Sequence, residues 1–232
     1  MGKKHMKTQT APVTWKIKRK SSKFVVRPNP GKSFRLSMPL SLIFKNLLKY
    51  CKTTKEVKSI LQDKKVIVDG SRRKDYKYPV GLMDVISLPV SDKHFRLFLD
   101  KNGNITVIEI KKKEAKLKPC KITNKSVLKQ AKIQLNFSDG RNLILKKDDY
   151  NVGDTLLIEL PGQKIKDHFK LKKGNYTYLT GGKNAGSHGI INKIEDDILV
   201  VESPVKKKIR TDKKYSFILG KKKSSIELPK LK

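Results

Sequence analysis

Residues 53–70 read TTKEVKSILQDKKVIVDG, and this stretch decides the fold of the first domain. Thr53 followed by Glu56 is a capping-box pattern, which marks the start of a helix, and the apolar residues after it recur at helical spacing. Residues 66–68 form a short apolar run typical of a buried strand. The Asp-Gly pair at residues 69–70 is a strong tight-turn signal. The stretch therefore predicts a helix, a strand and a hairpin turn in succession.

The flanking sequence extends this pattern in both directions. Between residues 39 and 49, apolar residues again follow helical spacing, while Lys45, Asn46 and Lys49 lie on the opposite face. After the turn the chain returns through a basic segment to residues 78–88, which read as a second turn and strand. Residues 36–93 therefore predict two short helices packed on a small sheet.

The remainder of the chain changes to a period of two, which is typical of strands. Hairpins are expected around the turns at residues 100–103 and 138–141, and a further strand is expected at residues 155–160. Residues 94–170 thus read as a central all-β domain. Residues 171–220 read as a third β-rich section around the glycine-rich stretch 181–189. The predicted fold class is α+β with several domains.

The charge distribution indicates a polyanionic partner. The formal net charge is +34 over 232 residues, and the first 55 residues contain 15 Lys or Arg and no Asp or Glu. Such self-repulsion favours a ligand that neutralises it, and nucleic acid is the obvious candidate. Residues 1–35, which lack a regular period, read as an extended basic arm, and residues 221–232 as a basic tail. Trp15 in the arm could stack on bases or pin the arm to its own domain.

The sequence offers no motif for catalysis or for a metal. Cys51 and Cys120 have no CxxC partner and are expected to be buried free thiols. The four His residues are scattered, and the glycine-rich stretch lacks the Lys-Ser/Thr that a phosphate-binding Walker loop requires. We therefore expect no catalytic residue, no metal, no cofactor and no small-molecule substrate. No apolar run reaches a membrane span, and without a signal-peptide pattern we expect a cytoplasmic protein with no membrane partner.

Positive charge is instead presented on defined scaffolds. Arg72, Arg73 and Lys74 follow a tight turn, where a rigid hairpin can fix cations at the spacing of a phosphate ridge. The alternative for these residues is a merely solvated charged turn. Lys183 and Asn184 lie among glycines that allow backbone amides to approach phosphates, although the glycines also suit a barrel turn with positive φ.

Several motifs in one order resemble the archaeal and eukaryotic small-subunit ribosomal protein S4e family. They are residues 66–70 (VIVDG), 78–86 (YPVGLMDVI), 95–97 (FRL) and 180–189 (TGGKNAGSHG). The resemblance implies an S4-type RNA-binding domain at about residues 36–93, a family-specific β domain to about 170 and an SH3-like KOW barrel from about 171. It also implies ribosomal RNA of the small subunit and neighbouring ribosomal proteins as partners, and the ribosome as the location.

The leading interpretation is therefore a structural, ribosomal RNA-binding protein that takes part in translation. The alternative is an RNA-binding accessory factor or an RNA-modifying enzyme subunit, which would need a catalytic domain that the small modules leave no room for. The candidate RNA-binding residues are Lys3, Lys4, Lys7, Trp15, Lys16, Lys18, Arg19, Lys20, Arg27, Arg35, Lys45, Lys49, Arg72, Arg73, Lys74, Lys183, Asn184 and His188.

Overall fold

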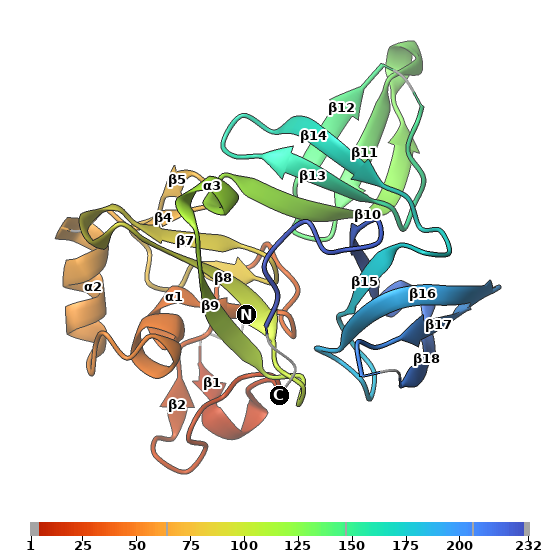
Figure 1. Ribbon diagram of the computed structural model, residues 1–232. Helices are drawn as coiled ribbons and strands as arrows, with labels where there is room; N and C mark the ends of the chain where they lie inside the picture. The colour runs from red at the N-terminus through yellow and green to blue at the C-terminus, as the bar shows by residue number, and fades with distance from the viewer. Residues whose placement is uncertain (1–4, 64, 147, 206, 230–232) are drawn as a thin grey trace. The chain divides into compact units, whose positions relative to one another are not determined.

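The computed structural model describes residues 5–63, 65–146, 148–205 and 207–229. The chain divides into two compact units (Figure 1). The N-terminal unit comprises Met1–Phe98 and Asn104–Lys116, and the C-terminal unit comprises Leu99–Gly103 and Leu117–Lys232.

Two helical segments of the N-terminal unit lie where the sequence predicts them. The first begins as α1 (Leu40–Leu42) and continues as a π-helical turn over Ile43–Leu47. The second is α2 (Thr54–Asp63). At its start the backbone N–H of Glu56 donates to Thr53 Oγ1 over 3.2 Å, so the predicted capping interaction is confirmed. The Glu56 carboxylate accepts from the Lys52 N–H, and this bond, with one from the Thr53 hydroxyl, lowers the pKa of Glu56.

The N-terminal unit also contains a five-stranded sheet, with the strand order β5-β4-β7-β8-β9. Its strands are β4 (Ile67–Val68), β5 (Ser71–Arg72), β7 (Val85–Leu88), β8 (Lys93–Leu99) and β9 (Ile105–Ile110). Asp69 and Gly70 both have positive φ, as a tight β4–β5 hairpin requires, so the predicted turn is confirmed. The short helix α3 (Lys112–Ala115) follows β9.

The sheet differs from the expectation in one respect. We expected the strands on either side of residues 100–103 to belong to a separate central domain. Instead β8 pairs antiparallel with β7, with Val85 opposite Arg96 and Leu88 opposite Lys93, and β9 follows as the edge strand. The reason is that the connection between β7 and β8 is a single 3₁₀ turn (Pro89–Ser91), and such a short connection favours antiparallel neighbours.

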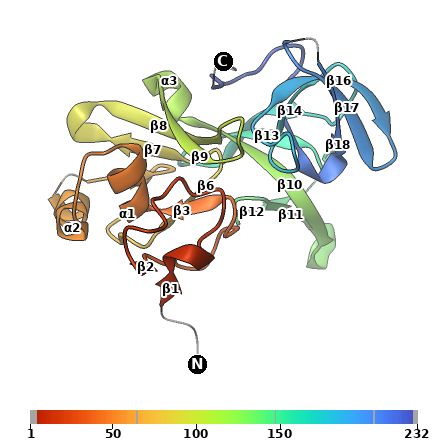
Figure 2. The ribbon, with the colours of Figure 1, turned by 90° about the horizontal axis from the view of Figure 1, so that it is seen from below.

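The N-terminal segment is packed onto its own unit rather than extended. The strands β1 (Met6–Lys7) and β2 (Phe24–Val25) pair antiparallel, while β3 (Ser37–Pro39) pairs with β6 (Pro79–Gly81). Trp15 lies between β1 and β2 in the sequence and is only 2% exposed. Figure 2 shows this segment lying beside α1 and β3. The description of residues 1–35 as an extended arm therefore does not hold for residues 6–25.

A second five-stranded sheet, in the order β12-β11-β10-β13-β14, lies in the C-terminal unit. The strands are β10 (Leu117–Val127), β11 (Ile133–Phe137), β12 (Asn142–Leu145), β13 (Thr155–Glu159) and β14 (Lys164–Phe169). The hairpin predicted around residues 138–141 is confirmed by the β11–β12 pairing. Cys120 packs in the core of this sheet with Ile122, Leu135 and Ile158. Both cysteines are buried free thiols, as expected.

The third sheet has the order β18-β17-β16-β15-β19. Its strands are β15 (Tyr176–Leu179), β16 (His188–Glu195), β17 (Ile198–Glu202), β18 (Lys208–Asp212) and β19 (Ser216–Gly220). All of its neighbouring strands pair antiparallel. Buried aliphatic residues such as Leu179, Ile191 and Val201 form its core, together with Leu157 and Phe169 of the second sheet.

Candidate nucleic-acid interface

An open groove of about 990 Å³ lies in the N-terminal unit between two walls. One wall is the helical segment that begins with α1, together with the residues that lead into α2. The other is the N-terminal segment from residue 8 to residue 26. The lining residues are Thr8, Trp15, Lys16, Ile17, Lys18, Ser21, Ser22, Phe24, Val25, Val26, Leu42, Lys45, Asn46, Lys49, Cys51, Lys52 and Thr54.

The helical wall follows from the residue spacing. Leu42, Lys45, Asn46 and Lys49 are separated by three or four residues, which places them on one face of a helix. The opposite face is formed by residues such as Ile43 and Phe44, which are fully buried. The π-helical turn is closed by the Leu48 N–H, which donates to the Ile43 carbonyl over 2.9 Å. The helix therefore buries its apolar face and presents two lysines and an amide to the groove.

The other wall is held in place by bonds within the N-terminal segment. Thr8 anchors it twice, because its N–H donates to the Lys23 carbonyl and its hydroxyl to the Ser22 carbonyl. The Arg19 guanidinium donates to the carbonyls of Ala11 and Pro12 over 3.1 and 2.9 Å. Arg19 was expected to contact RNA, but in this structure its guanidinium holds the loop between β1 and β2.

Trp15 fixes the base of this wall. Its indole Nε1 donates to the Ser37 carbonyl over 2.8 Å, and its ring lies 5.6 Å from that of Phe34. Of the two roles open to this residue, the structure supports pinning the segment to its own domain. Its buried ring is not available to stack on a base, so we remove Trp15 from the set of residues that contact RNA directly.

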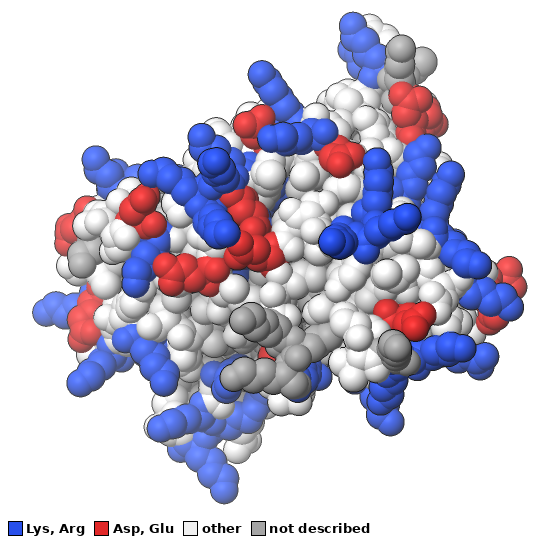
Figure 3. Space-filling view, viewed as in Figure 1, with Lys and Arg blue, Asp and Glu red and all other residues white. Residues whose placement is uncertain are grey.

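The groove has a single sign of charge. Its cations are Lys16, Lys18, Lys45, Lys49 and Lys52, and none of the described residues that line it is acidic. All but Lys45 are exposed. In the view of Figure 3, the lowest part of the surface, formed by β1, β2 and the loop between them, shows Lys and Arg without Asp or Glu. A concave site with cations of one sign concentrates a polyanion.

The three cations of the hairpin, Arg72, Arg73 and Lys74, differ in their contacts with the rest of the domain. The Arg72 guanidinium donates to the Gln62 carbonyl at the end of α2 over 2.8 Å. Arg73 lies over the Tyr78 ring, with its Cζ 4.4 Å from the ring centroid. Lys74 is exposed. The hairpin is thus braced against its own domain while its outer edge remains basic.

A smaller hollow of about 260 Å³ also adjoins β2 and shares Phe24, Val25 and Val26 with the groove. Arg27 and Lys77 line it together with His5, Phe24 and Tyr76. Lys58 and Lys77 lie over the Tyr76 ring at 4.9 and 5.7 Å from its centroid. A cation held over an aromatic ring stands next to a flat apolar surface. This combination suits RNA, which offers phosphates to the cation and bases to the ring.

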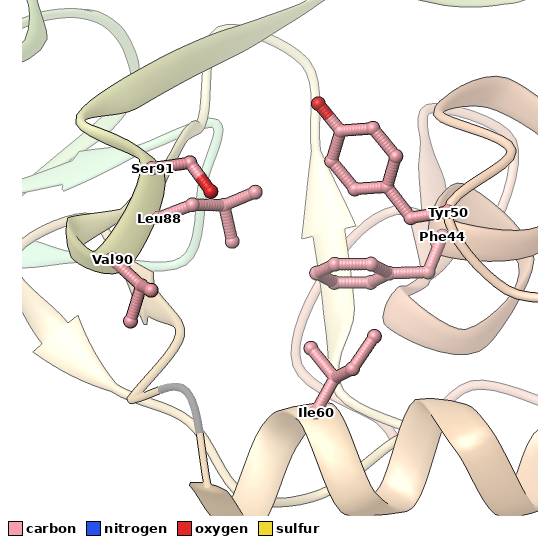
Figure 4. Close-up of a pocket in the computed structure, with 6 residues that line it drawn as sticks. All are labelled: Phe44, Tyr50, Ile60, Leu88, Val90 and Ser91. Carbon is pink, nitrogen blue, oxygen red and sulfur yellow. The ribbon is translucent and has the colours of Figure 1, made fainter.

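A third hollow has a different character. It measures about 250 Å³ and is lined by Phe44, Tyr50, Ile60, Leu88, Val90 and Ser91. Figure 4 shows Phe44 and Tyr50 facing Leu88 and Val90, with Ile60 rising from α2. Because none of the described residues that line it is charged, this hollow is not suited to phosphate.

The glycine-rich loop of the C-terminal unit uses its backbone internally. The N–H groups of Ala185, Gly186 and Ser187 donate to carbonyls at Gly182, Leu179 and Asn184. A Cβ on Gly186 would lie 1.9 Å from the Asp100 carbonyl oxygen, so this position requires glycine for close packing. Lys183 is exposed and Asn184 half-buried, so the side chains, more than the amides, are placed to contact a phosphate.

His188 lies inside the C-terminal unit. It is buried, and its Nδ1 lies 2.5 Å from the Tyr176 hydroxyl. Burial lowers its pKa, which favours the neutral ring. A neutral, buried imidazole is not a phosphate contact, so we also remove His188 from the set of direct RNA contacts.

The remaining predicted residues divide into two groups. Lys7, Lys20, Arg27 and Arg35 are exposed on the N-terminal segment but do not line the groove. Lys3 and Lys4 lie outside the described residues. Sequence reasoning missed three cations that the structure brings to these sites, namely Lys52, Lys58 and Lys77. The helical period of α2 predicts that Lys58 lies on its outer face, but only the fold brings it to Tyr76, and only the fold brings Lys52 to the same groove as residues 16–18.

Two properties of the described residues bear on other functions. Within the described ranges, no group of three or more His, Cys, Asp or Glu is placed to hold a metal ion. Nor does any helix in that part of the chain have the length and apolar character needed to cross a membrane.

A helix-and-sheet domain whose groove has five lysines and no acid among its described lining residues, followed by antiparallel β sheets, defines a protein of the nucleic-acid-binding class. Comparison with known families agrees. Residues 46–86 match the S4 domain, residues 91–165 match the ribosomal family S4e, and residues 1–31 match the RS4NT domain. The first match confirms the S4-type domain predicted within residues 36–93.

Similar proteins cover almost the whole chain. The small ribosomal subunit protein eS4 of Methanocaldococcus jannaschii is 42% identical, and that of Methanococcus maripaludis strain C6 is 40% identical. Both alignments span 97% of this chain and 98% of the relative. The crystal structure of the 30S ribosomal protein S4e from Thermoplasma acidophilum matches with a TM-score of 0.71 and 29% identity, over 80% of this chain and 96% of that one. The chain belongs to the S4e family of ribosomal proteins.

Proposed function

We propose that this protein is a structural component of the small ribosomal subunit and that it binds the subunit's RNA through the lysine-lined groove of its N-terminal unit. The observation that carries the proposal is the groove itself, with five lysines and no acidic residue among its described lining. The names of the relatives, which are small-subunit ribosomal proteins, support the assignment. Its place of action is then the ribosome in the cytoplasm, where it takes part in translation and adjoins other ribosomal proteins.

Phosphate neutralisation accounts for this kind of site. Each lysine that engages a phosphate releases a counterion, so binding weakens as salt rises. If all five groove lysines engage, they contribute about 3.5 to the slope of log K against log salt, by the single-strand coefficient of about 0.7 per phosphate. The basic hairpin at residues 72–74 and the exposed Lys183 would add further contacts of the same kind.

The third sheet completes the proposed architecture. We assign residues 171–220 to an SH3-like KOW module, which the five antiparallel strands β15–β19 and the glycine-rich loop between β15 and β16 support. In this assignment the loop presents Lys183 to RNA. A role as an accessory factor or an RNA-modifying enzyme is not favoured, since the relatives are named as ribosomal proteins and the family is structural.

The test is the salt dependence of binding to transcribed small-subunit ribosomal RNA. Lys45→Gln combined with Lys49→Gln should lower the slope by about 1.4 and weaken binding at every salt concentration. The matched control is Lys112→Gln combined with Lys214→Gln, because these exposed lysines already pair with Asp92 and Asp212. Equal losses in the two double variants would show that total charge, and not the groove, determines binding.

A further inference from the structure

The groove has apolar lining residues that a phosphate-binding site does not require. Its cations lie around an apolar floor that includes Ile17, Val25, Val26 and Leu42. The lysines account for the attraction of phosphates, but a phosphate makes no use of apolar side chains. At about 990 Å³ the groove lies at the upper end of the roughly 300–1,000 Å³ range of small-ligand sites. Its ligand should therefore combine negative charge with a flat apolar group.

Phe24 is the most informative residue of this floor. It belongs to β2, which the pairing of Met6 with Val25 and Lys7 with Phe24 holds in place. Nevertheless its side chain is 49% exposed. Lys23 Nζ lies 5.6 Å from the centroid of its ring. An exposed aromatic on a fixed strand, next to a cation, offers a stacking surface with little loss of conformational freedom on binding.

The groove also holds groups that can read the edge of a base. Asn46, on the helical wall, carries an amide donor and an amide acceptor, and it is only half-buried. Ser21 and Ser22 line the facing wall. Both hydroxyls donate to carbonyls of their own segment, which leaves their oxygen lone pairs able to accept. An amide and hydroxyls opposite each other suit a planar ligand with hydrogen-bonding edges.

We propose that the groove binds a single-stranded RNA nucleotide whose base is unstacked, with the base against Phe24 and the flanking phosphates on the lysines of the rim. In a continuous duplex the base faces are stacked on one another and only phosphates, sugars and base edges reach the protein, so no base face is available for the apolar floor. The RNA partner is accordingly a loop, bulge or junction rather than uninterrupted helix. This inference rests on the proposed function, because it specifies which RNA the same groove accepts.

The experiment compares two defined RNA probes with the full-length protein. One is a single-stranded 12-mer with a central 2-aminopurine, and the other is a blunt 12-base-pair RNA duplex. The wild-type protein should bind the single strand more tightly and should change the 2-aminopurine fluorescence. Phe24→Ala should weaken single-strand binding about tenfold, the size of a lost stacking contact, and leave duplex binding within twofold.

Two further variants keep the test decisive. Phe24→Leu retains an apolar side chain on β2 without the aromatic face, and it should reproduce most of the loss even if Phe24→Ala is poorly folded. Tyr50→Ala is the matched control, since Tyr50 is 45% exposed but lines the apolar hollow of Figure 4 instead of the groove. It should leave both RNAs unaffected.

The outcomes separate this proposal from the proposed function. Equal effects of the Phe24 variants on both RNAs, or no effect on either, would overturn the base-binding site even if Lys45→Gln with Lys49→Gln still weakened binding. If those lysine substitutions changed nothing, the proposed function of the groove would fail first. Selective loss of single-strand binding in both Phe24 variants, with Tyr50→Ala unchanged, would support the base-binding site.

Discussion

The lysine-lined groove and the glycine-rich loop both suggest phosphate binding when read as sequence, yet they are built in opposite ways. In the groove, apolar residues pack inward and Lys16, Lys18 and Lys49 are left exposed. In the loop, the glycines themselves are the packing element, since a Cβ at Gly186 would collide with the Asp100 carbonyl. Glycine therefore serves close backbone contact within the protein here, and the charge for a partner comes from side chains. Four experiments test this contrast.

The largest effect is expected at Trp15, which supports one wall of the groove. Trp15→Ala should lower the free energy of unfolding of the N-terminal unit by about 4 kcal/mol, because it removes a buried ring and its bond to Ser37. Urea denaturation followed by circular dichroism measures this. Val13→Ala, at an exposed position, serves as the control. A loss under 1 kcal/mol with weaker RNA binding would return Trp15 to the direct contacts.

The loop should respond strongly to one added methyl group. Gly186→Ala should lower the free energy of unfolding of the C-terminal unit by about 3 kcal/mol, because it adds a collision to the strain of a positive φ. Gly174→Ala is the matched control. Its φ of +87° resembles the +83° of Gly186, but a Cβ there meets nothing within 4 Å, so about 1 kcal/mol is expected. Similar losses at both positions would mean that φ alone makes Gly186 necessary.

A third experiment concerns a lysine of the C-terminal unit that points inward. Lys121 Nζ donates to the carbonyls of Lys214 and Ser216, and burial lowers its pKa to about 8. Because the folded pKa lies below the unfolded value of 10.5, the unfolded state binds more protons between these values, and stability rises with pH from 8 to 10.5. Desolvation outweighs the two hydrogen bonds, which favour the charged form, and the lowered pKa corresponds to a gain in the free energy of unfolding of about 2 kcal/mol between pH 8 and pH 10.

The measurement for Lys121 is the urea midpoint at pH 8 and pH 10, compared with that of Lys121→Met. Only the wild-type protein should show the additional gain with pH. If the urea midpoints of the two proteins changed in parallel with pH, Lys121 would remain charged in the folded state over this pH range, and burial would not lower its pKa.

The smallest effect is expected from single lysines. Lys49→Gln in the groove and Lys183→Gln in the loop should each lower the salt slope of RNA binding by about 0.7. Replacing all five groove lysines should lower it by about 3.5, whereas the loop has only Lys183 to lose among residues 181–189. A slope unchanged by Lys183→Gln would restrict the glycine-rich loop to a structural role.

Local patterns in the sequence predicted much of this structure. The helix cap at Thr53 and Glu56, the hairpin turn at residues 69–70 and the basic face of Lys45, Asn46 and Lys49 are all set by residues within a few positions of one another. The sequence also predicted the family, because several motifs occur in one order.

The remainder depends on contacts between residues distant in the chain, which no local period records. The bond from Trp15 to Ser37 turns an expected arm into a folded segment. The pairing of β8 with β7 moves two strands into the first sheet. Burial of His188 and the use of the Arg19 guanidinium on nearby carbonyls remove two expected RNA contacts, since exposure cannot be read from composition.

The position of Trp15 has a practical consequence, because it is the only tryptophan among the 232 residues. All indole fluorescence of the protein therefore arises from one place, under the groove and beside Lys16 and Ile17. Its emission should be blue-shifted in the native protein and should shift to the red when the N-terminal unit unfolds, whatever the state of the C-terminal unit. Occupancy of the groove by RNA should change its intensity without that shift. The protein thus carries its own optical reporter, which can follow binding and unfolding in one sample without a label.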